Sequence, residues 1–295
     1  MKTFSSGESR PIIIIAAARS GTKMLQAALS VAPGIASFPY EIDYTWKYGN
    51  YHIDHDELTR EHVTEDIQNF IRTQFSKLLK KSDAKRVLEK TVANSLRVDF
   101  VRAVFPECLI VHLFRDGRDV AASAKLYGQS QGPKEDVLKK LAEVPIKAWP
   151  YLFHEVRGFA SLYANRLLFK KDHLKSWGPR FIGIDEAFQK YSIIEVCGIQ
   201  WARCVELSLA QLSSLKENED YINLRYEDLV QNPVHELKRV AEFLKIENFD
   251  PIKDYAETRI KDSYIGSWRT RLSEEEKEKL LPVIDRYLKA LGYVD

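Results

Sequence analysis

The sequence has 295 residues, of which 45% are hydrophobic, so it can bury the core of one large domain. The formal net charge of +2 excludes the strongly basic surface of a nucleic-acid-binding protein, and any positive potential must be local. The cysteines Cys108, Cys197 and Cys204 form no Cys-x-x-Cys pair, so we expect no disulfide framework and no metal site, and we favour a reducing, cytoplasmic location. The apolar run 12–18 is too short to span a membrane.

Predicted strands and helices alternate along the chain. Runs of β-branched and apolar residues predict strands at 12–18, 35–38, 86–89, 109–114 and 221–225. Apolar residues at helical spacing predict helices from residue 26, at 57–81, 96–105, 119–127, 195–216, 233–245 and 273–291. Residues 128–192 are rich in prolines and aromatic residues and are predicted as a helical insertion with a mobile loop near 128–133. The alternation predicts an α/β fold, with residues 1–295 as a single domain in which helices flank a central parallel sheet.

The segment 12–25 combines a buried strand, a short turn and the start of a helix. The turn consists of Arg19, Ser20, Gly21, Thr22 and Lys23. Such a geometry points backbone N–H groups and a helix N-terminus at one place, where a phosphate can bind. The turn is not a Walker A loop, because Ala16 and Thr22 stand where that motif has its first glycine and its lysine. An ordinary turn after a core strand is the other interpretation.

A second segment places an arginine and a serine after another predicted strand. Arg115 follows the strand 109–114, and Ser123 lies about two helical turns later. Arginine suits the fork-like recognition of phosphate, and a serine hydroxyl can donate to the same oxygens. In open parallel sheets, ligands bind at the carboxyl ends of the strands, where both segments fall. A surface arginine is the alternative for Arg115 taken alone.

Both segments resemble the donor-binding motifs of sulfotransferases that use 3′-phosphoadenylyl sulfate (PAPS). Three further segments are similar to motifs of that family and follow in the family's order: 89–106, with the run Glu-Lys-Thr, then 224–244, with Arg-Tyr-Glu-Asp-Leu, and 266–293. Because the matches span nearly the whole chain, it is identified as a member of this family with a P-loop-type fold. It looks closer to the branch acting on proteins and carbohydrates than to the cytosolic small-molecule branch.

The resemblance implies which residues bind the donor. The turn residues 19–23 would wrap the 5′-phosphosulfate, although Ala18 and Lys23 replace the proline and second threonine that the family has there. Arg115 and Ser123 would hold the 3′-phosphate. The remaining implied donor-binding residues are Tyr226 against the adenine, with Trp268 and Arg269 from a C-terminal loop. PAP, the 3′,5′-bisphosphate of adenosine, would be the product.

The resemblance also implies the catalytic residues. Sulfuryl transfer needs positive groups where charge builds on the leaving oxygen, and Arg19 and Lys90 would supply them without a metal ion. The acceptor hydroxyl needs a base. Val92 stands where the small-molecule branch has a histidine, so the base would be a glutamate after the loop. Glu41 is the candidate, and Asp43 is the second choice.

An aromatic cluster beside Glu41 bears on the acceptor. Tyr40, Tyr44, Trp46, Tyr48 and Tyr51 offer flat faces of the kind that stack on sugar rings, and a packed aromatic patch is the alternative. We favour a carbohydrate or glycolipid hydroxyl. A P-loop kinase is the runner-up, although it needs a Walker lysine and a magnesium-holding acidic group that the sequence does not place. A non-catalytic nucleotide-binding protein is the third alternative.

Overall fold

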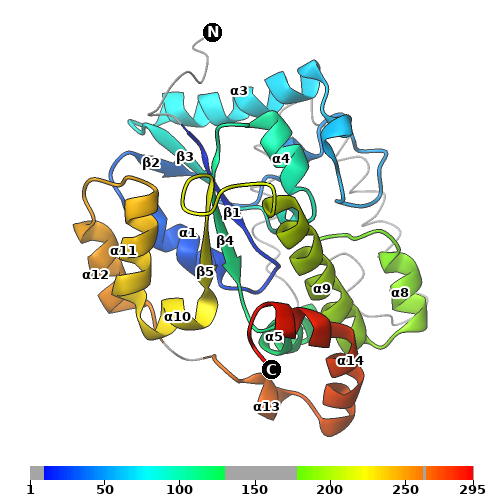
Figure 1. The fold of residues 1–295 in the computed structure, drawn as a ribbon. Coiled ribbons are helices and arrows are strands. Elements are labelled where there is room, and N and C mark those ends of the chain that lie inside the picture. The colour runs from blue at the N-terminus through cyan, green and yellow to red at the C-terminus, as the bar shows by residue number, and fades with distance from the viewer. Residues whose placement is uncertain (1–9, 130–177, 262–263, 295) are drawn as a thin grey trace.

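The computed structural model describes residues 10–129, 178–261 and 264–294. At its centre is a five-stranded sheet of order β2-β3-β1-β4-β5, in which each strand is parallel to its neighbours (Figure 1). The strands are β1 (Ile12–Ile15), β2 (Ile35–Ser37), β3 (Arg86–Glu89), β4 (Leu109–Phe114) and β5 (Tyr221–Arg225). The predicted α/β class with a central parallel sheet is confirmed.

Helices follow most of the strands, as the alternation predicts. The longer helices are α1 (Thr22–Ser30), α3 (Glu65–Lys81), α4 (Val98–Val104), α5 (Gly117–Gln129), α8 (Ile184–Lys190), α9 (Ile193–Leu212), α11 (Pro233–Phe243), α12 (Asp250–Arg259) and α14 (Glu274–Ala290). The shorter ones are α2 (Asp43–Trp46), α10 (Tyr226–Gln231) and α13 (Trp268–Arg271), with the 3-10 turns η1 (Arg60–His62) and η2 (Val92–Leu96). Most of the predicted insertion 128–192, including 130–133 of its loop, lies outside the described residues.

The prediction that a helix starts at residue 57 is wrong, because α3 begins only after Thr64. The hydroxyl of Thr64 caps α3 by accepting a hydrogen bond from the Ile67 N–H. Glu57 is held elsewhere: its carboxylate accepts hydrogen bonds from Arg203 of α9 at 2.7 Å and from the Ile182 N–H at 3.0 Å. These tertiary contacts, which a periodicity pattern does not contain, decide where the helix begins.

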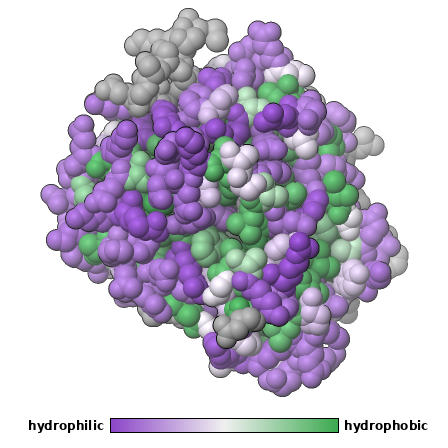
Figure 2. All heavy atoms as spheres, viewed as in Figure 1, coloured by the Kyte–Doolittle hydropathy of each residue, from purple (hydrophilic) through white to green (hydrophobic). Residues whose placement is uncertain are grey.

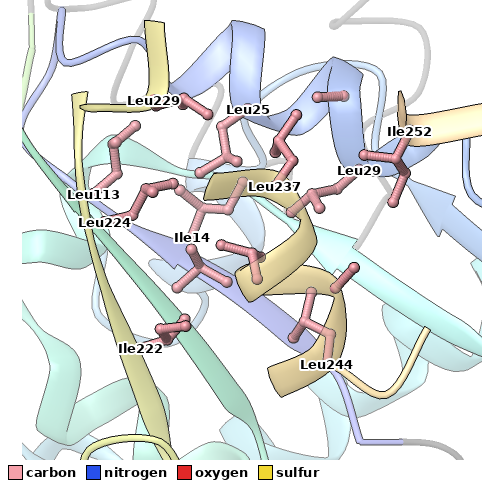
Figure 3. Packing of buried hydrophobic residues seen from close by; sticks show 14 of the residues in the cluster. Ile14, Leu25, Leu29, Leu113, Ile222, Leu224, Leu229, Leu237, Leu244 and Ile252 are labelled. Atoms are coloured by element: carbon pink, nitrogen blue, oxygen red, sulfur yellow. The ribbon is translucent and has the colours of Figure 1, made fainter. Parts of the chain in front are cut away.

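The isoleucines of β1 alternate between the two faces of the sheet, and each is at most 1% exposed. Ile12 and Ile14 pack against α1, α10, α11 and α12 (Figure 3). Ile13 and Ile15 pack on the other face with α3, α4 and α2. Burial on both faces is what an uninterrupted β-branched run predicts for a central parallel strand.

A third hydrophobic cluster joins α5, α9 and α14 near the carboxyl ends of the strands. Gly117, which begins α5, lies directly on Trp201 of α9, since a Cβ there would be 2.6 Å from the indole ring. Cys197 and Cys204 are free and buried in this cluster. Figure 2 shows hydrophobic residues gathered near the middle of one face, with hydrophilic residues around them. No helix among the described residues is both long and apolar enough to cross a membrane.

Candidate active site

The loop between β1 and α1 makes a tight turn through two residues in the left-handed region. Arg19 has a φ of +69° and Gly21 a φ of +92°. A side chain at Gly21 does not fit, because a Cβ would lie 2.6 Å from Cδ2 of Tyr226. No side chain caps the N-terminus of α1, and its first turn carries no acidic residue. The turn therefore leaves the N–H groups and the positive end of a helix for an anion.

Ser20 and Thr22 carry hydroxyl groups in this loop. Ser20 is 1% exposed, and its Oγ has no hydrogen-bond partner among the described atoms. A buried unpaired polar group costs about 1–3 kcal/mol, so the site is suited to a ligand oxygen. Thr22 is also buried, whereas the side chain of Lys23 is exposed. The residues present thus fit the 5′ end of a nucleotide.

Arg115, at the carboxyl end of β4, connects the loop to the C-terminal segment. Its guanidinium donates hydrogen bonds at 3.0 Å to the carbonyl oxygens of Arg19 and Tyr264. Cζ lies 4.1 Å from the ring centroid of Tyr226. Arg115 is 5% exposed, and its Nε has no partner among the described atoms. This buried cation therefore keeps one donor free.

Ser123 of α5 contacts Arg19 of the loop. The Arg19 Nε donates to the Ser123 Oγ at 3.1 Å, and its guanidinium lies over the ring of Tyr127. Burial lowers the pKa of Arg19. Tyr127 raises this pKa by a smaller amount, and the positive charge of Arg115 lowers it further. The structure thus brings Arg19, Ser123 and Arg115 together, although they come from three separate segments.

Tyr226 lies under the loop rather than open to solvent. The ring is 5% exposed, with Gly21 against its edge and the guanidinium of Arg115 over its face. Its contact with an adenine stays a prediction. The structure shows Tyr226 packed against Gly21 of the β1–α1 loop and under the guanidinium of Arg115.

Asp119 is a buried residue beside Arg115 whose contacts the sequence analysis missed. It is 1% exposed and accepts hydrogen bonds from the Gly266 N–H at 2.7 Å, the Ser267 Oγ at 3.0 Å and the Trp268 N–H at 2.8 Å. These bonds attach the C-terminal loop to α5, near Arg115. The available signal was its place one helical turn after Arg115.

The predicted C-terminal residues lie in the loop that Asp119 holds. The guanidinium groups of Arg118 and Arg269 both contact the ring of Trp268, each 4.7 Å from its centroid. Arg269 is exposed, and Arg118 is fixed by Asp116 at 2.7 Å. The loop therefore presents positive charge beside the carboxyl end of β4.

Lys90 and Glu41 meet in an ion pair. Lys90 Nζ lies 2.6 Å from Glu41 Oε1, and the side chains are 3% and 26% exposed. Lys90 follows Glu89, whose partner in the sheet is Ile13 of β1. The pair therefore stands at the same edge of the sheet as the β1–α1 loop. Two of the predicted catalytic residues are in direct contact.

Asp43, the second choice for the base, is engaged differently. Its Oδ1 accepts a hydrogen bond from the Arg97 NH2 at 3.0 Å. Partial burial raises the pKa of Asp43, whose side chain is 35% exposed; the neighbouring charges of Asp56 and Glu41 raise this pKa as well, while Arg97 lowers it. Asp43 is therefore part of an ion-pair network, whereas Glu41 contacts the predicted catalytic lysine.

Part of the aromatic cluster beside Glu41 is core. Trp46 is fully buried and packs edge-on against Phe75 and Phe105, and Tyr48 stacks on Phe70 with ring centroids 3.7 Å apart. These two rings follow the packed-patch interpretation. The four tyrosines of the cluster, Tyr48 included, are only partly buried. In the part of the chain that the structure describes, no group of three or more His, Cys, Asp or Glu side chains is arranged to hold a metal ion.

A family model described as the sulfotransferase domain matches residues 9–287, nearly the whole chain. The chain therefore belongs to the sulfotransferase family. It is a PAPS-dependent sulfotransferase, and PAP is its nucleotide product.

Solved structures of sulfotransferases share the fold. Sulfotransferase STF9 from Mycobacterium avium is 13% identical with a TM-score of 0.56, covering 97% of this chain and 77% of that one. The sulfotransferase domain of the Synechococcus PCC 7002 olefin synthase is 12% identical with a TM-score of 0.54, covering 97% of each chain. The domain from the curacin biosynthetic pathway is 14% identical with a TM-score of 0.52, covering 95% of this chain and 99% of that one. The search of curated proteins gave no matching sequence.

Proposed function

We propose that this sulfotransferase transfers the sulfuryl group of PAPS to a hydroxyl of a carbohydrate or glycolipid, with Glu41 as the base. The observation that carries the proposal is the contact of 2.6 Å between Lys90 and Glu41. It joins a cation and a carboxylate from distant segments at the carboxyl edge of the sheet, beside the loop that suits an anion. An acceptor hydroxyl placed there has a proton acceptor and a positive charge within reach.

The donor is held by the two motifs and the C-terminal loop. The 5′-phosphosulfate binds at residues 19–22 and the N-terminus of α1, with the unpaired hydroxyl of Ser20 as one donor. The exposed Lys23 adds charge at the rim. Arg115 and Ser123 bind the 3′-phosphate. Trp268 and Arg269 flank the nucleotide, and we assign Tyr226, which packs under the loop and Arg115, to the adenine end of the donor.

The reaction is an in-line displacement at sulfur. The acceptor oxygen forms a bond to the sulfur, the bond from the sulfur to the bridging oxygen of the donor breaks, and Glu41 takes the acceptor proton. Arg19 and Lys90 neutralise the charge that builds on the bridging oxygen, so PAP leaves as a stabilised anion. Lys90 also orients the Glu41 carboxylate before the acceptor arrives.

The proposed acceptor class rests on the aromatic residues around Glu41. Tyr40 precedes Glu41 directly, and Tyr44 begins the next turn; both rings are partly buried at the edge of the core. A partly buried tyrosine ring at the surface offers a flat apolar face with a polar tip, which suits a sugar ring. Trp46 takes no part, because it is fully buried, and the face of Tyr48 is covered by the stacked ring of Phe70.

Glu41→Gln tests the proposal. The variant should lower kcat by roughly 10²–10⁴-fold, the usual contribution of a general base. Its affinity for PAP should match that of the wild type, because Glu41 stands on the acceptor side. Glu278→Gln, the same change at an exposed position of α14, is the control and should keep full turnover. Turnover of Glu41→Gln near the wild-type rate would contradict the assignment of the base.

A panel of acceptors tests the class of substrate. Sulfated product formation is measured with mono- and oligosaccharides, a glycolipid in detergent micelles and a simple phenol. We expect transfer to the sugars or the glycolipid. Transfer to the phenol alone would contradict the carbohydrate proposal and leave the sulfotransferase assignment intact.

A further inference from the structure

The three residues from Glu41 to Asp43 are each held by a side chain of the segment that follows β3. Lys90 Nζ contacts Glu41 Oε1 at 2.6 Å, and the Ile42 N–H donates to the Thr91 Oγ1 at 3.2 Å. The third contact joins Arg97 NH2 to Asp43 Oδ1 at 3.0 Å. Lys90, Thr91 and Arg97 are at most 3% exposed. The segment that carries the proposed base is therefore fixed from inside the protein.

Glu89, directly before these residues, orients two of them. The Thr91 hydroxyl donates to Glu89 Oε1, and the Asn94 amide donates to Glu89 Oε2 at 3.0 Å. A hydroxyl has only one proton, so the bond to Glu89 turns the lone pairs of Thr91 toward the Ile42 N–H. The Asn94 Oδ1 in turn accepts from the Arg97 Nε at 2.8 Å. The two carboxylate oxygens of Glu89 thus orient Thr91 and Asn94, and through them the hydrogen bonds to Ile42 and Asp43.

Burying the charged and polar groups of this network costs free energy of folding that an apolar core would not require. Glu89 is 0% exposed, and burial raises its pKa to about 7, against smaller opposing effects of Thr91, Trp46 and Lys90. A well-packed apolar group in such a place is often as stable as buried charges. The hydrogen bonds that start at Glu89 end on Ile42 and Asp43, in the segment 41–43 that carries the proposed base. We therefore ask whether the network holds this segment in position.

We propose that Thr91, oriented by Glu89, is a positioning residue for the base. It fixes the backbone of Ile42 and thereby the carboxylate of Glu41 relative to Lys90 and the donor loop. Arg97 acts at the next residue through Asp43 and through Asp56, whose Oδ1 lies 3.3 Å from NH1. The inference rests on the proposed role of Glu41.

Thr91→Val is the direct test. The change keeps the shape and removes both hydrogen bonds of the hydroxyl. We expect kcat to fall by about 10- to 100-fold, since small misplacements of a reacting group have effects of this order. The Kd for PAP and the KM for PAPS should stay within about 2-fold. Thr91→Ser, which keeps the hydroxyl, should restore turnover.

Thr45→Val is the matched control. Thr45 lies in α2, close to the base in sequence, and is also fully buried, but its hydroxyl has no partner among the described atoms. The same chemical change there should leave kcat unaltered. If Thr91→Val does not fold, Thr91→Cys replaces it, with a weak hydrogen-bonding group in the same place, and a smaller decrease in kcat is expected.

A double variant separates positioning from general stability. If Thr91 acts through Glu41, then Thr91→Val should cause little further loss in a Glu41→Gln background. An equal loss in both backgrounds, or a parallel loss of PAP affinity, would overturn the inference while the base assignment stands. Full turnover of the single variant Glu41→Gln would instead overturn the assignment of the base, so the failure of the proposed function and the failure of this inference are read from different variants.

Discussion

Replacing Gly21 by alanine tests how tightly the donor loop packs on Tyr226. The φ of +92° costs a residue with a Cβ about 1–2 kcal/mol. The new Cβ would also lie 2.6 and 2.7 Å from Cδ2 and Cε2 of Tyr226. That ring is 5% exposed and covered by Arg115, so the loop or the ring must shift, at about 1–3 kcal/mol. We expect a total loss of about 2–5 kcal/mol in the free energy of unfolding.

Gly34→Ala is the control for the backbone term. Gly34 has a φ of +79°, and a Cβ there meets no heavy atom within 4 Å. Unfolding in denaturant should show Gly21→Ala to be at least about 1 kcal/mol less stable than Gly34→Ala. Calorimetry should show weaker PAP binding in Gly21→Ala alone, and a Tyr226→Ala change should recover part of its stability. Equal losses in the two alanine variants, with PAP affinity unchanged, would refute the packing of the loop on Tyr226.

Two further predictions concern buried carboxylates. Burial raises the pKa of Glu89 from 4.5 to about 7, so the folded state holds a proton that the unfolded state has lost, and stability falls as pH rises through this window. Glu89→Gln should flatten the fall in the free energy of unfolding between about pH 4.5 and 7, which amounts to roughly 3 kcal/mol; an identical slope in the variant would contradict the shift. Asp119→Ala should speed amide hydrogen exchange of Gly266 and Trp268 by at least about 10-fold. Unchanged exchange there would show that Asp119 does not hold the loop.

The sheet and the places of the loop 19–23, Arg115 and Ser123 in it could be predicted from the sequence because their signals are local. The predicted bounds are correct for three strands, β3, β4 and β5. Each is a short apolar run between turns, which is the pattern of a buried strand. The loop 19–23 and the Arg115 and Ser123 pair follow strands whose carboxyl ends must meet at one edge of the sheet. Topology alone then brings Arg19 to Ser123.

The features that the sequence did not predict depend on partners far along the chain. Asp119 and Arg97 look like ordinary charged residues until the structure shows that both are buried and that Asp119 holds 266–268 while Arg97 holds 43 and 56. The prediction that a helix starts at residue 57 is wrong, and Glu57 instead forms an ion pair with Arg203 of α9. Trp46 suggested a sugar platform, but Phe75 and Phe105 enclose it.

The 3′-phosphate distinguishes PAPS from common nucleotides, so calorimetry of the wild-type protein with PAP and with AMP tests the central claim most directly. Arg115 has a free Nε beside the loop, and Ser123 lies next to Arg19. A charge-assisted hydrogen bond contributes roughly 1.5–3 kcal/mol, so PAP should bind at least ~10-fold more tightly than AMP. Equal affinity for the two nucleotides would contradict the assignment of this site to PAPS.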